Sequence, residues 1–111
     1  MTPEQMDNSR KHTGPSKTRT SFYRRLYLAW LVEKEIDNLP AICSLSGMPR
    51  RTAQDTLSAL AELDILCHFK QTEGARQNQG HYQILDWGAV NPAWVDAHIK
   101  DIAATLGYPL P

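Results

Sequence analysis

The stretch SLSGMPRRTAQDTL, residues 44–57, combines a glycine, a proline and two adjacent arginines with the start of a helical pattern. Gly47 suits the left-handed backbone that commonly ends a helix. Pro49 suits the first position of the next helix, because its missing N–H is not needed there. Ala53 and Leu57 then lie four residues apart, on one face of a helix. The stretch therefore predicts a helix, a tight turn and a second helix, which we call the reading helix.

Helical signals also precede this stretch. Thr20 and Ser21 are good N-cap residues for a first, strongly apolar helix that runs to about Asp37. Asn38 can cap a short second helix that begins at about Leu39 and has a proline in its first turn. The short helix and the reading helix then flank the turn at the glycine.

The remainder of the chain predicts a β-hairpin and one more helix. Residues 66–72 and 81–87 are rich in aromatic and branched side chains, and a polar segment with a glycine near each end separates them. Asn91 and Pro92 indicate a cap and a first helical turn, and Gly107 indicates the end of that helix. The predicted fold is mainly α with a small β-hairpin. Three helices, a two-stranded wing and a C-terminal helix follow the winged helix-turn-helix plan.

The run ICSLSGMPRRTAQDTLSALAELDIL, residues 42–66, resembles the winged helix-turn-helix superfamily, and the resemblance covers about residues 22–87. It is similar to the G-x-x-x-x-T-…-L-x-x-L core of MarR-like and GntR-like bacterial repressors. The length and the last helix also resemble those of short bacterial winged-helix proteins of mostly unassigned role. Pro49 stands where a capping Ser or Thr is usual, and Asp64 stands where a Gly is usual. The resemblance implies that the reading helix enters the major groove of DNA.

The composition is that of an ordinary soluble domain. The chain has 111 residues, of which 41% are hydrophobic and 22% charged, enough for one domain with its own core. We divide it into a disordered basic arm (1–19), a winged helix-turn-helix domain (20–90) and a C-terminal dimerisation helix with a tail (91–111). No apolar run approaches the ~20 residues of a membrane helix, and the N-terminus is too polar for a secretory signal. We therefore expect a cytoplasmic protein whose two cysteines, Cys43 and Cys67, are free thiols.

The formal net charge is zero, but the charge is unevenly distributed. Residues 1–25 carry six Lys and Arg against two acidic residues, and the other 86 residues carry six against ten. A basic arm on a mildly acidic body favours contact with nucleic acid, although a solvated tail has the same composition. Arg24 and Arg25 lie in the first turns of the first helix, where positive charge opposes the helix dipole. Their position therefore suits either an external anion or tertiary partners.

The outer face of the reading helix supplies the candidate base readers. Six residues lie on or beside that face: Arg50, Arg51, Thr52, Gln54, Asp55 and Ser58. Arginine can bind guanine, and glutamine can bind adenine, through two parallel hydrogen bonds. Thr52 can donate to a phosphate, and Asp55 can either hold the Arg51 guanidinium or accept from cytosine. A solvated helix face that touches no DNA has the same residue types.

The predicted hairpin supplies a second set of candidates. Three polar residues at its tip can contact DNA: Arg76, Gln77 and Asn78. Lys70 lies on the strand that leads to them, and one arginine with amides suits the DNA backbone or the minor groove. The alternative is a solvated tip. His68 and His81 lie on paired strands, but no cysteine or carboxylate cluster at metal-ligand spacing accompanies them, so we expect no metal.

The last helix carries the strongest apolar stripe of the chain. Its members are Val95, Ile99, Ile102 and Leu106, with Trp94 at the margin. A three-helix core with a small hairpin has little room to cover both this stripe and the apolar first helix. We therefore expect the stripe to pack against a second copy in a homodimer. The alternative is that the helix folds back over its own domain.

These features together predict a bacterial-type transcription regulator that binds double-stranded DNA sequence-specifically as a homodimer. The alternative is a winged-helix module that binds a protein partner and reads no bases. The sequence has no glycine-rich phosphate loop, nucleophile motif or paired-carboxylate pattern, so we expect neither enzymatic activity nor a cofactor. No membrane partner is expected, and no motif identifies a small-molecule effector.

Overall fold

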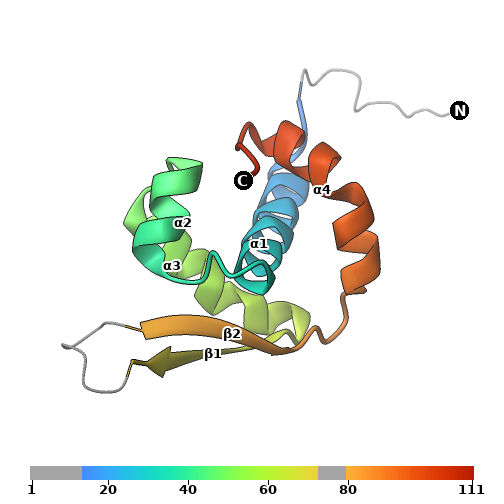
Figure 1. Cartoon of the computed structure of the whole chain (residues 1–111). Helices are drawn as coiled ribbons and strands as arrows, with labels where there is room; N and C mark the ends of the chain where they lie inside the picture. Colours follow the sequence, from blue (N-terminus) through green and yellow to red (C-terminus); the bar gives the residue numbers. More distant parts are fainter. Residues whose placement is uncertain (1–13, 73–79) are drawn as a thin grey trace, which may run out of the picture.

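The computed structural model describes residues 14–72 and 80–111 (Figure 1). Its elements are α1 (Lys17–Glu33), α2 (Leu39–Ser46), α3 (Arg50–Ala59), the 3-10 turn η2 (Leu60–Leu63), β1 (Leu66–Gln71), β2 (Gly80–Asp86) and α4 (Pro92–Leu106). Helix α1 lies between α4 on one side and α2 and α3 on the other, and the hairpin runs along one end of the helices (Figure 1). This order of helices and antiparallel strands confirms the predicted fold class.

Helix α1 begins earlier and ends earlier than the sequence predicted. The Ser16 hydroxyl accepts a hydrogen bond from the Arg19 amide at 3.1 Å, so Ser16 is the N-cap instead of Thr20 or Ser21. Residues 17–19 therefore belong to the helix, which corrects the boundary placed at residue 20; the rest of the predicted arm, residues 1–13, lies outside the described residues. The helix ends at Glu33, because the chain soon enters the left-handed region at Glu35 (φ 70°).

The turn between α2 and α3 forms as the sequence predicted. The Asn38 side chain caps α2 by accepting from the Ala41 amide at 2.9 Å, and Gly47 ends it in the left-handed region (φ 77°). The Ser46 hydroxyl accepts from the Met48 amide at 3.0 Å, which fixes the path of the turn. Pro49 precedes α3 and supplies no side-chain cap. Local hydrogen bonds at both ends of α2 therefore specify the start of the motif and its turn.

The hairpin is attached to the helical body. Strands β1 and β2 pair antiparallel with Phe69 opposite Tyr82, and the two rings lie 5.0 Å apart between centroids. The Tyr82 amide donates to the carbonyl of Asp37, in the loop between α1 and α2, at 2.7 Å. This bond joins the middle of the hairpin to the loop before the helix-turn-helix. The predicted strands are confirmed to within a residue or two at each end.

A second attachment lies where the chain leaves η2 and returns from β2. Asp64 adopts the left-handed conformation (φ 61°) that the usual glycine would take at this position. The amide of Ala89 donates to the Leu63 carbonyl at 3.0 Å. Gly88 also has a positive φ (58°), and a Cβ atom on it would overlap the Asp64 carbonyl. The two segments are therefore in direct backbone contact.

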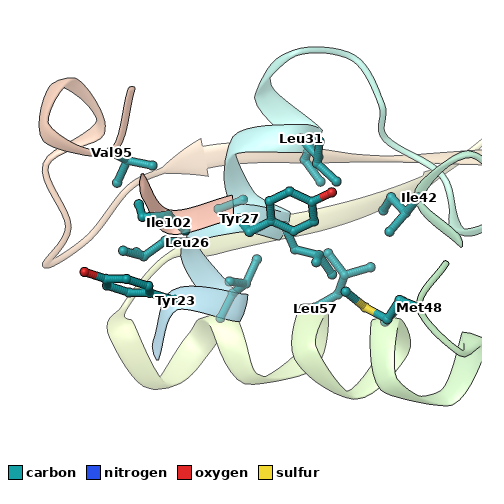
Figure 2. Packing of buried hydrophobic residues seen from close by; sticks show 14 of the residues in the cluster. Tyr23, Leu26, Tyr27, Leu31, Ile42, Met48, Leu57, Val95 and Ile102 are labelled. Carbon is teal, nitrogen blue, oxygen red and sulfur yellow. The ribbon is translucent and has the colours of Figure 1, made fainter. Parts of the chain in front are cut away.

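Side chains from all four helices of the described residues meet in one core. Figure 2 shows Leu26 of α1 beside Ile102 of α4, and Tyr27 of α1 between this pair and the side chains of Leu57 of α3 and Ile42 of α2. The Tyr27 hydroxyl reaches the edge of this core and donates to the Pro109 carbonyl at 2.7 Å. Helix α1 is the central element, because it contributes buried residues toward both neighbouring groups of helices.

The apolar stripe of α4 packs inside the chain itself. Val95 and Ile102 are fully buried and Ile99 is 7% exposed, and Figure 2 shows Ile102 beside Leu26 of α1. The expectation that these three side chains face a second copy is therefore wrong, since α1 already covers them. Leu106 is partly buried against the same core.

Two smaller expectations concern the margin of α4 and the thiols. Trp94, at the margin of the stripe, remains 42% exposed. Cys43 and Cys67 are free and partly buried against the core, which agrees with the expected free thiols.

Candidate nucleic-acid interface

The outer face of α3 is exposed as the sequence predicted. Ala53 and Leu57 point into the core, and the predicted base readers at the start of the helix, Arg50, Arg51 and Gln54, are exposed. Ser58 is exposed one turn further on, whereas Thr52 is half-buried. The structure thus brings three side chains that can read base edges together on the first turns of one helix.

Asp55 is placed differently from one of its predicted roles. It lines a hollow of about 210 Å³ between α1 and α3, together with Ser21, Arg24 and Arg25. Within residues 14–72 and 80–111, no ion pair joins it to Arg51. Asp55 therefore borders the same hollow as the two arginines of α1, and the predicted Arg51–Asp55 pair does not form in the described part of the chain.

Arg24 and Arg25 are half-buried where α1 packs against α3. One guanidinium nitrogen of Arg25 donates to the Ser21 hydroxyl at 2.8 Å, and another lies 3.4 Å from the Glu62 carboxylate. The Nε atoms of both arginines are buried and have no hydrogen-bond partner in the described part of the chain. Arg25 therefore has one tertiary partner, Glu62, which is one of the two possibilities that the sequence left open.

The hairpin is connected to the end of α3 through η2. The 3-10 turn follows α3 directly and contacts both α3 and β1. Burial raises the pKa of the Tyr82 hydroxyl on β2, the nearby Cys67 thiol adds to this rise, and the positive charge of Arg50 opposes it.

The described part of the hairpin presents basic and imidazole side chains on one face. Lys70 lies opposite His81, and His68 lies opposite Gln83, so these four side chains share a face of the two strands. Lys70 is exposed, as a contact with a phosphate requires. The described residues contain no group of three or more side chains that could hold a metal ion.

The predicted tip residues, Arg76, Gln77 and Asn78, lie outside the described residues. Their contact with DNA therefore stays a prediction from the sequence. The strands that lead to them, in contrast, are described and pair with each other from Leu66–Asp86 to Gln71–Gly80.

Sequence reasoning missed a second group of basic side chains. Lys17 and Arg19 were assigned to the arm, but they lie on the first turn of α1, where they line the same groove as Trp94. The signal that could have found them is Ser16, which is as good an N-cap as the two residues that were chosen.

The chain belongs to the winged helix-turn-helix family, whose model matches residues 17–106. A solved structure of a DUF2131 family protein from Shewanella amazonensis SB2B is similar, with 40% sequence identity and a TM-score of 0.78. The similarity covers 85% of this chain and 96% of that one. No curated protein matches the chain. Family membership indicates DNA binding, and the described helices include none long and apolar enough to cross a membrane.

Proposed function

We propose that the protein binds double-stranded DNA sequence-specifically and regulates transcription, with α3 in the major groove and the hairpin against the adjacent backbone. The observation that carries this proposal is the outer face of α3, where Arg50, Arg51 and Gln54 are exposed together. In the described part of the chain, neither arginine forms an ion pair. Such a guanidinium can form two parallel hydrogen bonds with guanine, and the glutamine amide can do the same with adenine.

The other side chains of this surface have positioning roles in the proposal. Thr52 and Lys70 suit phosphates on either side of the groove, because Thr52 lies in the first turn of α3 and Lys70 lies on the hairpin. Arg76, Gln77 and Asn78 extend the same contact along the DNA. The chemistry requires no bound cofactor, since base readout by side chains is a matter of hydrogen-bond geometry alone.

Selection from a random duplex library at a stated salt concentration tests the proposal. We expect an enriched half-site whose affinity falls steeply as salt rises, because phosphate contacts release counterions. The Arg51→Ala variant should lose the preference at one base position of that half-site. Failure to bind any duplex at low salt would overturn the proposal in favour of a module that binds protein.

We further propose that two copies act together on an inverted repeat, with reading helices about one helical turn (~34 Å) apart. Because α1 covers the stripe of α4, the pairing cannot use Val95, Ile99 and Ile102. The DNA itself then brings the two copies together. Light scattering after size exclusion should give the mass of one chain for the free protein and of two chains on a duplex with both half-sites. A mass of one chain on that duplex would contradict the pairing.

A further inference from the structure

A groove of about 910 Å³ lies along the first half of α1, between η2 and the start of α4. The residues of its lining that matter here are Lys17, Arg19, Arg25, Phe22, Leu63 and Trp94. Among the described residues, no acidic side chain contributes to this lining, although the chain as a whole carries as many acidic as basic residues. The groove therefore combines positive charge with an apolar surface.

The positive charge comes from one side of the groove. Lys17 and Arg19 are exposed on the first turn of α1, which contains no acidic residue. Arg19 is held in place, because its guanidinium donates to the Tyr23 hydroxyl at 3.0 Å and lies 5.4 Å from the centroid of that ring. Arg25 lies further along α1, is 21% exposed at its side chain and pairs with Glu62 at 3.4 Å, so its charge is already shared. The charges of Lys17 and Arg19 are complementary to phosphates.

The apolar surface comes from aromatic rings that remain accessible. Phe22 is 36% exposed and Trp94 is 42% exposed. The indole of Trp94 stacks on the His98 ring, with 4.1 Å between centroids and an interplanar angle of 16°. The imidazole supports the indole from one side and so holds it in a fixed orientation. A rigid, exposed aromatic ring beside cations suits the stacking of a nucleic-acid base.

We propose that this groove binds single-stranded DNA, at a site separate from the duplex surface of α3. Unpaired bases can stack on Phe22 and Trp94 while Lys17 and Arg19 contact the phosphates, which is the combination that single-strand sites use. A duplex cannot make this contact, because the faces of its bases are already stacked on one another. A two-fold contact with a second copy is disfavoured, since it would bring the same two cations of each copy together. The proposal goes beyond the reading of duplex DNA and does not depend on it.

Fluorescence anisotropy of labelled oligo-dT, ten nucleotides long, tests the site at low salt. Trp94→Ala should weaken binding by about 5- to 150-fold, the range for loss of one stacked base. Trp94→Phe should restore most of the affinity. Leu85→Ala is the matched control, because Leu85 is equally exposed but lies on β2, outside the groove, and it should bind as the wild type does.

Charge variants test the phosphate contacts. Lys17→Glu should weaken oligo-dT binding several-fold more than Lys100→Glu, which changes the net charge equally but lies on α4 outside the groove. Equal effects of the two variants would mean that only the overall charge matters and would overturn the site. Wild-type affinity of the Trp94→Ala variant would overturn it as well. Thymidine monophosphate that binds as tightly as the oligonucleotide would also contradict it, by showing a site for a small anion.

Two further measurements separate this site from the others. Arg51→Ala should leave oligo-dT binding unchanged, and Trp94→Ala should leave duplex binding unchanged. Failure of the duplex proposal would therefore leave this one standing, whereas loss of both activities in both variants would contradict two separate sites. A change of mass in the Trp94→Ala variant would contradict the proposal by showing that Trp94 holds copies together.

Discussion

The protein contains two pairs of adjacent arginines, and the structure gives them opposite surroundings. Arg50 and Arg51 begin α3, are exposed and form no ion pair within the described residues. Arg24 and Arg25 lie inside α1 and are half-buried where it packs against α3, and Arg25 contacts Ser21 and Glu62. The same dipeptide thus lies on an exposed surface in α3 and in a contact between helices in α1.

This difference shows that position in the fold, and not residue type, decides what a basic pair can do. A half-buried arginine covers apolar surface with its methylene groups and fixes its charge to a neighbour, so its loss affects folding. An exposed arginine without a partner contributes little to folding and keeps its donors for a ligand. The two pairs should therefore separate stability from binding when each is changed.

The largest expected loss of stability comes from a core substitution, and it is the reference against which the arginine variants are compared. Ile102→Ala should lower the free energy of unfolding by about 2–5 kcal/mol, because it removes a fully buried side chain between α4 and α1. Urea unfolding measures the change, and Lys100→Ala on the exposed face of α4 should stay within about 0.5 kcal/mol of wild type. A comparably small loss for Ile102→Ala would mean that α4 does not form part of the core.

The next effect is the dependence of stability on pH. Because every arginine stays charged over this range, the change can be assigned to the Tyr27 hydroxyl. Burial, with a smaller contribution from the nearby Tyr108, raises the pKa of Tyr27 to about 12. Below about pH 10 the Tyr27 hydroxyl keeps its proton in both the folded and the unfolded protein. Between about pH 10 and 12 only the folded protein keeps it, so the free energy of unfolding falls as the pH rises. The full loss is about 2–3 kcal/mol. Urea unfolding from pH 9 upward should show a shallower decline for Tyr27→Phe; equal declines would contradict the assignment.

The exposed arginine pair should affect binding alone. We expect Arg51→Ala to weaken the best duplex site by about 1–3 kcal/mol, or roughly 5- to 150-fold, and to relax preference at one base pair. Its unfolding free energy should stay within about 0.5 kcal/mol of wild type. Anisotropy titrations on matched and mismatched duplexes, with urea unfolding alongside, check both halves. A stability loss as large as that of Ile102→Ala would show that Arg51 is part of the packing.

Changing the half-buried pair should have the smallest effect. In contrast to Arg51, it should alter stability and not duplex binding. Arg25→Ala should lower the unfolding free energy by about 0.5–1 kcal/mol through loss of the Ser21 and Glu62 contacts, and should leave duplex affinity nearly unchanged. Lys34→Ala is a suitable comparison, because the Lys34 side chain of the Lys34–Asp96 pair is 47% exposed, against 21% for Arg25, and its loss should matter less. A duplex-binding defect in Arg25→Ala without loss of stability would place Arg25 on the DNA instead.

The helix-turn-helix could be predicted from the sequence because its signals are local. Asn38, Gly47 and Pro49 each act on backbone groups within a few residues, so their types almost determine the turn. The inward and outward faces of α3 followed from the spacing of Ala53 and Leu57 for the same reason. What the exposed face binds is a matter of surface chemistry, and it stays a proposal.

The parts that the sequence could not predict depend on contacts between distant segments. The stripe of α4 was identified correctly, but periodicity shows which face of a helix is apolar and not what covers it. The covering element is α1, whose side chains Leu26 and Tyr27 come from the other end of the chain. The Glu62 partner of Arg25 likewise comes from a distant segment, 37 residues further along the chain.

The backbone contact at Gly88 has a consequence for how the chain tolerates mutation. Gly88 is exposed, and exposed positions normally accept many residues. At this one, a side chain would overlap the Asp64 carbonyl, and the positive φ adds strain for any residue with a Cβ. A library of single substitutions should therefore reject changes at Gly88 as strictly as changes in the interior. A tolerance map drawn from solvent exposure alone would assign this position to the wrong class.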